Sequence, residues 1–312
     1  MVISASRRGD IVAYYAPWFM NRLREGYVLV QNPYHKNHYT KITLTPAVVD
    51  CIVFWTKNPM PILEHLQEID DMGYRYYFQF TLTPYGKEIE RGVPDKESLF
   101  KAFSTLSEKI GNDRVIWRYD PILINSRYST AHHIHVFSKM ARRLKGMTKR
   151  CVISFVDVYS WMSAQTKSEL CSGITKESME CIAEAFGQIA KENGMQIYTC
   201  AEEADLSSYG IGHGACIDPI IIEEIINCSI EAKKDKNQRP ACGCIESVDI
   251  GAYDSCPGGC RYCYATKSQS VAEKNRRMHM PASPSLIGTI SEKDKITERR
   301  TESLVGRQRK MW

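Results

Sequence analysis

The chain has 312 residues, 43% of them hydrophobic and 25% charged, which is typical of a globular protein with a substantial core. No apolar run approaches the roughly 20 residues of a membrane span, and the N-terminus lacks the pattern of a signal peptide. These features favour a cytoplasmic protein without membrane contact. The net charge of +5 is uneven, because residues 266–312 hold 11 Lys and Arg against 5 Asp and Glu. They form a predicted basic C-terminal extension that packs on the body or trails from it, and that gives nucleic-acid binding only weak support.

Short β-rich segments alternate with longer amphipathic segments over residues 1–265, which is the pattern of βα units around a mainly parallel sheet. Strands are expected at 2–5, 51–55, 74–82, 115–117, 151–155, 195–199 and 245–250. Helices are expected at 14–26, 62–72, 96–110, 130–144 and 176–193, near residue 218, and after Ser291. Residues 209–214 are expected to form a Gly-rich loop. The sequence therefore predicts one α/β domain over residues 1–265, a TIM-like (β/α) barrel or partial barrel.

Charged or thiol side chains follow most of the predicted strands. In parallel α/β sheets, ligands bind beyond the carboxyl ends of the strands, so side chains at these positions are candidates for the site. The candidate catalytic residues are Arg7, Arg8, Asp10, Lys57, Arg118, Asp120 and Glu202. The arginines could hold a carboxylate or phosphate of an unknown small-molecule substrate. The alternative is a structural role, in which these arginines form ion pairs with Asp10 and Asp120.

Three of the twelve cysteines, Cys256, Cys260 and Cys263, have the spacing C-x3-C-x2-C in a loop that contains Pro257, Gly258 and Gly259. Without a secretion signal, such a group indicates metal ligands rather than disulfides. Three thiolates can hold an iron–sulfur cluster, and a [4Fe-4S] cluster would keep one iron open to a ligand from outside the protein. Structural zinc is the alternative.

Four further cysteines are less certain metal ligands. Cys242 and Cys244 lie just upstream of the loop and could complete a zinc site or supply a fourth cluster ligand, although C-x-C is not the usual zinc-knuckle spacing. Cys200 and Cys216 flank the Gly-rich segment and could bind a second cluster or act as redox thiols. The alternative for this second pair is simple burial, because free cysteine is among the most buried residue types.

The spacing of the cysteine loop, with Tyr262 before the third cysteine, resembles that of radical S-adenosylmethionine (radical SAM) enzymes. The run from Gly259 to Ala265 looks like the spore photoproduct lyase branch of that superfamily. Over its whole length the chain resembles a bacterial family of unknown function. The stretches that carry this second resemblance are residues 6–10, 54–59, 117–121 and 242–244.

The radical SAM resemblance implies that Cys256, Cys260 and Cys263 bind three irons and that SAM chelates the fourth, with Tyr262 near the adenine. It also implies one-electron reduction by a donor such as a ferredoxin or flavodoxin, followed by SAM cleavage to a 5′-deoxyadenosyl radical. In radical SAM enzymes the motif follows the first barrel strand, whereas here it follows the last predicted strand. A circularly permuted barrel would reconcile the two. An iron–sulfur electron-transfer protein without SAM and a nucleic-acid repair or modification protein are the alternatives.

Overall fold

The computed structural model describes residues 1–35, 37–160 and 162–306. Its main feature is a sheet of eight parallel strands, in the spatial order β10-β1-β4-β5-β6-β7-β8-β9. The strands are β1 (Val2–Ser4), β4 (Cys51–Thr56), β5 (Tyr76–Thr81), β6 (Val115–Ile122), β7 (Arg150–Phe155), β8 (Gln196–Cys200), β9 (Ile211–Gly214) and β10 (Val248–Asp249). Among the described residues, β9 and β10 do not pair with each other. The fold is therefore α/β with a large parallel sheet, and closure into a barrel is not confirmed.

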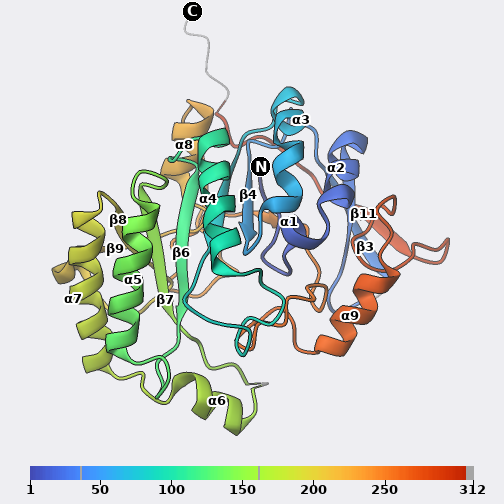
Figure 1. Cartoon of the computed structure of the whole chain (residues 1–312). Coiled ribbons are helices and arrows are strands. Elements are labelled where there is room, and N and C mark those ends of the chain that lie inside the picture. The colour runs from blue at the N-terminus through green and yellow to red at the C-terminus, as the bar shows by residue number, and fades with distance from the viewer. Residues whose placement is uncertain (36, 161, 307–312) are drawn as a thin grey trace, which may run out of the picture.

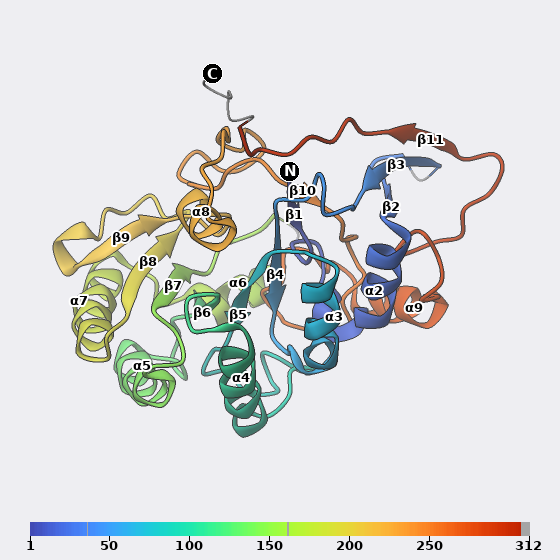
Figure 2. The same cartoon turned by 90° about the horizontal axis from the view of Figure 1, so that it is seen from above.

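Helices cover both faces of the sheet (Figures 1 and 2). They are α1 (Ile11–Tyr14), α2 (Ala16–Glu25), α3 (Leu66–Asp71), α4 (Lys96–Ile110), α5 (Thr130–Leu144), α6 (Ala164–Cys171), α7 (Lys176–Glu192), α8 (Pro219–Ile226) and α9 (Gln269–Met278), with 3-10 turns η1 (Met60–His65) and η2 (Ser207–Tyr209). One face packs against α2, α3, α4, α5 and α7, and the other packs against α8.

Successive residues of each strand point to opposite faces, which explains these two core layers. Ile52 and Phe54 of β4 belong to the larger layer, whereas Cys51 and Val53 belong to the layer under α8. Both layers are apolar, as expected for a parallel sheet that is covered on both sides. The described residues include no helix long and apolar enough to span a bilayer.

Local signals at the helix ends agree with the sequence predictions. Asp95 accepts a hydrogen bond from the Ser98 N–H at 2.9 Å and so caps α4, and the helix stops before Gly111. Gly26 ends α2 with a positive φ of 73°, a conformation that glycine adopts without a steric cost. The predicted helices at 96–110 and 130–144 are confirmed with these bounds.

Two predicted elements are wrong. The Gly-rich segment expected to be a loop contains the edge strand β9, in which Gly212 and Gly214 pack closely against the Tyr198 side chain. The helix expected after Ser291 is instead strand β11 (Lys295–Glu298). This strand pairs in parallel with β3 (His38–Thr43), which also pairs with β2 (Tyr27–Gln31). A partner strand from the far end of the chain decides the conformation of the residues after Ser291, and this partner is not visible in the local sequence.

The predicted C-terminal extension contributes α9 and β11, and its residues 307–312 lie outside the described part of the chain. The Trp18 indole N–H donates to the Ser283 carbonyl oxygen at 2.9 Å, and the His279 ring meets the Tyr15 ring edge-on at 4.6 Å. Figure 1 shows α9 beneath α2, on the same side of the molecule as β11. This segment therefore packs against the N-terminal part of the domain.

Candidate functional site

The cysteine loop follows β10 and packs against the segment after β5. The Gly92 N–H donates to the Gly258 carbonyl oxygen at 2.8 Å, and Glu90 and Cys260 form an isolated antiparallel bridge. A Cβ atom on Gly92 would lie 2.9 Å from that same Gly258 oxygen, so a side chain there would push the loop away. Backbone contacts that depend on glycine therefore fix the loop to the body of the domain.

The three thiols of the loop are partly exposed and lie near one another. Backbone N–H groups of Asp10 and Gly258 face the Cys256 sulfur. Burial, with a smaller contribution from the Asp10 carboxylate, raises the pKa of the Cys256 thiol to about 12, and burial also raises that of Cys260. Without a metal these two thiols stay protonated at neutral pH, so a metal that binds them must displace their protons.

Glu90, whose side chain is buried, organises the polar groups beside the loop. Its Oε1 accepts hydrogen bonds from Lys57 Nζ at 2.8 Å, from Thr83 Oγ1 at 2.7 Å and from the Tyr262 hydroxyl, and its Oε2 accepts one from Lys96 Nζ at 3.1 Å. Burial alone would raise the pKa of the Glu90 carboxyl, but the two ammonium groups outweigh it and lower the pKa to about 2. Glu90 is therefore ionised and fully paired at neutral pH.

Lys57 and Tyr262, two predicted site residues, meet at Glu90. The Lys57 ammonium lies 5.5 Å from the centroid of the Tyr262 ring and faces the Cys260 thiol. Tyr262 is buried, and its ring meets Tyr85 edge-on at 6.1 Å. The structure thus brings a cation, an aromatic ring and a thiol together.

Asp10 joins the ends of two strands. One carboxylate oxygen caps α1 by accepting from the Ala13 N–H at 2.9 Å, and the other accepts from the Lys57 N–H at 2.9 Å and from the Thr56 hydroxyl at 3.1 Å. Burial raises the pKa of Asp10 to about 6, although these hydrogen bonds oppose the increase. In this structure Asp10 acts as a positioning group that holds Lys57.

Arg118 and Asp120 lie in a second group with two cysteines. Arg118 is 5% exposed, forms an ion pair with Asp120, and donates from Nη1 to the Cys216 sulfur at 2.7 Å. The Cys200 and Cys216 sulfurs lie 3.0 Å apart. Cys244 Sγ accepts from the Ile217 N–H at 3.4 Å.

Arg7 lies between this second group and the cysteine loop. Its guanidinium is 3.5 Å from the Asp235 carboxylate and close to the Cys244 thiol, and its carbonyl oxygen accepts from the Tyr264 hydroxyl. Arg8 pairs instead with Asp249, at 3.6 Å. The expected ion pairing is therefore found for Arg118 with Asp120, whereas Arg7 and Arg8 have partners that the sequence did not indicate.

Glu202 lies near Asp120, whose negative charge adds slightly to the increase that burial causes in the pKa of the Glu202 carboxyl. Its Oε1 accepts a hydrogen bond from the Phe155 N–H at 2.7 Å, which links the segment after β8 to the end of β7. Burial raises the pKa of the Glu202 carboxyl to about 7. Glu202 can therefore change its charge near neutral pH.

The family model for the domain of unknown function DUF1848 matches residues 2–265. The chain belongs to this family. The match covers all eight strands of the parallel sheet and the cysteine loop.

Other comparisons add little. No curated protein matches the chain. Among solved structures, one match is described as a "putative alpha-L-fucosidase from Bacteroides thetaiotaomicron VPI-5482", with 10% identity and a TM-score of 0.27. The aligned region covers 51% of this chain and 66% of that chain, slightly less than two thirds. This likeness carries no argument about function.

Sequence reasoning missed Glu90, Lys96 and Thr83. These three residues lie close together in the sequence, but Lys57 and Tyr262, which meet them at Glu90, are 33 and 172 residues from Glu90, so no local spacing pattern reveals the group. The nearest signal was the run from Glu88 to Arg91, which places two carboxylates in the loop after β5.

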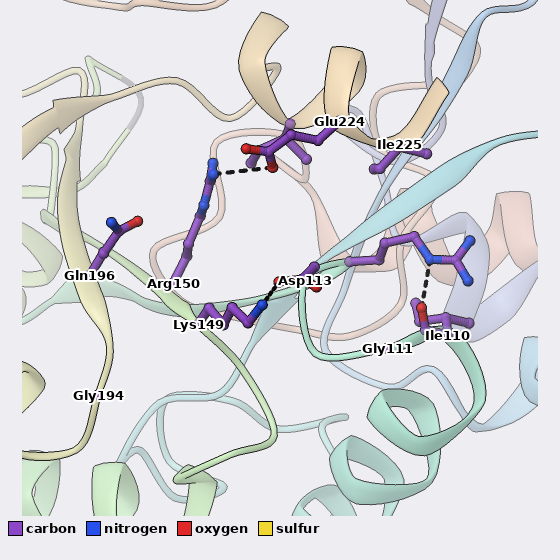
Figure 3. A pocket seen from close by; sticks show the side chains of 11 residues that line it. Ile110, Gly111, Asp113, Lys149, Arg150, Gly194, Gln196, Glu224 and Ile225 are labelled. Atoms are coloured by element: carbon purple, nitrogen blue, oxygen red, sulfur yellow. Dashed lines mark hydrogen bonds and ion pairs between the residues drawn. The ribbon is translucent and has the colours of Figure 1, made fainter. Parts of the chain in front are cut away.

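A cavity of about 700 Å³ opens at the other end of the strands, near the amino ends of β6, β7 and β8 (Figure 3). Its rim carries two ion pairs, Lys149 with Asp113 at 2.5 Å and Arg150 with Glu224 at 3.4 Å. The cysteines and the predicted site residues do not line it. At this edge of parallel α/β folds, side chains more often support stability than chemistry.

Within residues 1–35, 37–160 and 162–306, no three or more His, Cys, Asp or Glu side chains are gathered in the arrangement of a formed metal site. The thiols of the cysteine loop are neighbours, but their sulfurs do not surround a common point. Cys242 and Cys244 lie close to Cys216, in the group that also contains Arg118, Asp120 and Cys200.

Proposed function

We propose that the chain is a [4Fe-4S] protein of the radical SAM type that acts on a small molecule, with Cys256, Cys260 and Cys263 as the iron ligands. The observation that carries the proposal is the C-x3-C-x2-C loop, which follows a strand of the parallel sheet and presents three neighbouring thiols. Three ligands keep one iron free for the amino and carboxylate groups of SAM. The bound cofactor would supply radical chemistry, and the protein would orient the substrate and exclude water.

The chemistry of the donor set fits an iron–sulfur cluster. Thiolates are the ligands that such clusters use, and hydrogen bonds to the sulfurs tune them. The Cys256 sulfur faces the N–H groups of Asp10 and Gly258, and the Lys57 ammonium faces the Cys260 thiol. The N–H groups and the Lys57 ammonium oppose the effect of burial, which raises the pKa of these thiols, and so reduce the cost of forming the thiolates when a metal binds.

Tyr262 and Lys57 are the residues beside the loop to which we assign contacts with SAM and substrate. Glu90 holds both, since it binds the Tyr262 hydroxyl and the Lys57 ammonium. This arrangement fixes the two side chains before any ligand arrives, which lowers the entropic cost of binding. Arg118 and Asp120, both in β6, are further candidates for substrate contact.

The test is anaerobic reconstitution with iron and sulfide, followed by reduction with dithionite and addition of SAM. We expect a reduced-cluster EPR signal that changes when SAM is added, and formation of 5′-deoxyadenosine. The Cys256→Ala variant should lose both responses, whereas Cys181→Ser, at an exposed position of α7, should keep them. A cluster whose EPR signal ignores SAM, with no 5′-deoxyadenosine formed, would show that the radical SAM assignment is wrong.

A further inference from the structure

Four cysteines outside the loop converge from three segments of the chain. Cys200 ends β8, Cys216 follows β9, and Cys242 and Cys244 precede β10. The Cys200 and Cys216 sulfurs are 3.0 Å apart, and hydrogen-bonding contacts continue from Cys216 to Cys244 and from Cys244 to Cys242. These contacts link the four thiols in a row, which we call the inner thiol group.

Glycines make this convergence possible. A Cβ atom on Gly243, between the last two cysteines, would lie 3.0 Å from the Gly214 carbonyl oxygen and 3.5 Å from the Ala215 Cβ. A Cβ atom on Gly214 would lie 2.8 Å from the Tyr198 Cβ. Gly243 therefore lets the segment with Cys242 and Cys244 pack closely on the segment before Cys216, and Gly214 lets β9 pack closely on β8, which ends at Cys200.

Two of the four sulfurs of the inner thiol group, those of Cys216 and Cys244, already accept hydrogen bonds from N–H donors. Cys216 Sγ accepts from Arg118 Nη1 at 2.7 Å, and Cys244 Sγ accepts from the Ile217 N–H at 3.4 Å. Metal-bound thiolates receive hydrogen bonds of this kind, whereas a cysteine that only fills core space needs none. Arg118 is itself buried, and its ion-pair partner is Asp120. Arg7, paired with Asp235, brings a second guanidinium beside Cys244.

We propose that Cys200, Cys216, Cys242 and Cys244 form a second metal site, which binds one thiophilic ion, zinc or iron, through four thiolates. In a tetrahedral site with metal–sulfur bonds of about 2.3 Å, neighbouring sulfurs lie about 3.8 Å apart. Direct sulfur contacts fit a single ion better than a four-iron cluster, whose ligand sulfurs lie farther apart. Because the thiols lie in a row, binding requires rotation of their side chains around the ion.

This site is independent of the cysteine loop, so the experiment removes the loop ligands first. The full-length Cys256→Ala/Cys260→Ala/Cys263→Ala variant is purified anaerobically, and its zinc and iron are measured by elemental analysis. We expect about one equivalent of metal, and zinc and iron content distinguish the two ions. Adding Cys216→Ser and Cys244→Ser should remove it, whereas adding Cys181→Ser should not. Circular dichroism checks that each variant is folded.

X-ray absorption on the triple variant provides a readout that does not depend on the serine variants folding. Four sulfur ligands to one metal ion would support the proposal. A folded triple variant that binds no zinc or iron would overturn it, as would a metal bound mainly by nitrogen or oxygen. A Cys200–Cys216 disulfide in the anaerobically purified, metal-free protein would also overturn it. None of these results tests the proposed cluster in the cysteine loop. That cluster is tested separately, by the SAM response of the chain with its loop cysteines intact.

Discussion

At the scale of single residues, Glu90 is the side chain on which the polar arrangement beside the cysteine loop depends. We expect Glu90→Gln to lower the free energy of unfolding at pH 7 by about 3 kcal/mol, because it removes the charge that Lys57 and Lys96 share. Urea unfolding measures the change. The matched control is Glu97→Gln, which breaks an exposed pair with Arg143 and should change stability little. Equal effects of the two substitutions would contradict the role given to Glu90.

Glu202 gives a pH-dependent prediction at the same scale. Its pKa is raised to about 7 in the folded state from an ordinary value of 4.5, so the folded protein binds the proton more tightly than the unfolded chain. Its contribution to stability is therefore complete below about pH 4.5 and is lost as the pH rises to about 7. We expect the unfolding free energy of the native chain, relative to Glu202→Gln, to fall across this range. The exposed Glu203→Gln control should keep the native pH profile, and parallel curves for Glu202→Gln and the native chain would refute the prediction.

At the scale of elements, the position of the cysteine loop against the segment after β5 depends on Gly92. In Gly92→Ala, the new Cβ would lie 2.9 Å from the Gly258 oxygen, a backbone atom that cannot rotate away. We expect the loop to shift and the iron bound after reconstitution to fall by at least half. Gly306→Ala is the control, because its Cβ would meet only the end of the Glu231 side chain, at 3.4 Å. Full iron content in Gly92→Ala would show that the loop does not depend on this contact.

Elements with a local signal could be predicted from the sequence, and elements that depend on distant partners could not. The helix 96–110 has a capping aspartate, an amphipathic pattern and a terminal glycine, and each of these is visible within the segment. All four residues of strand β11 are at the surface and they form no apolar face, so only its pairing with β3 defines it. The same reasoning applies to the candidate site. The spacing of the loop cysteines is visible within a single short segment, whereas Glu90 joins Lys57 and Tyr262, which lie 33 and 172 residues away in the sequence.

At the scale of the whole molecule, the carboxyl ends and the amino ends of the parallel strands should differ in function. The loop cysteines and Lys57 follow the carboxyl ends of β10 and β4, and the cavity with Lys149 lies at the amino ends of β6, β7 and β8. We expect Lys57→Ala to weaken the response of the reduced cluster to SAM, measured by EPR titration, by tenfold or more. Lys149→Ala, which breaks a surface pair with Asp113, should leave it within about twofold. If Lys149→Ala weakened the response to SAM more than Lys57→Ala did, the SAM site would lie at the cavity instead.

The position of β1 between β4 and β10 has a consequence for the order in which the protein is made. Residues 2–4 are synthesised well before one of their two neighbouring strands, residues 248–249, which follows about 240 residues later. Because synthesis runs from the N-terminus, the edge of β1 stays open during most of translation. The thiols of the cysteine loop follow β10 by only a few residues. If the loop binds a cluster as we propose, the metal can be delivered only after nearly all of the parallel sheet has been synthesised.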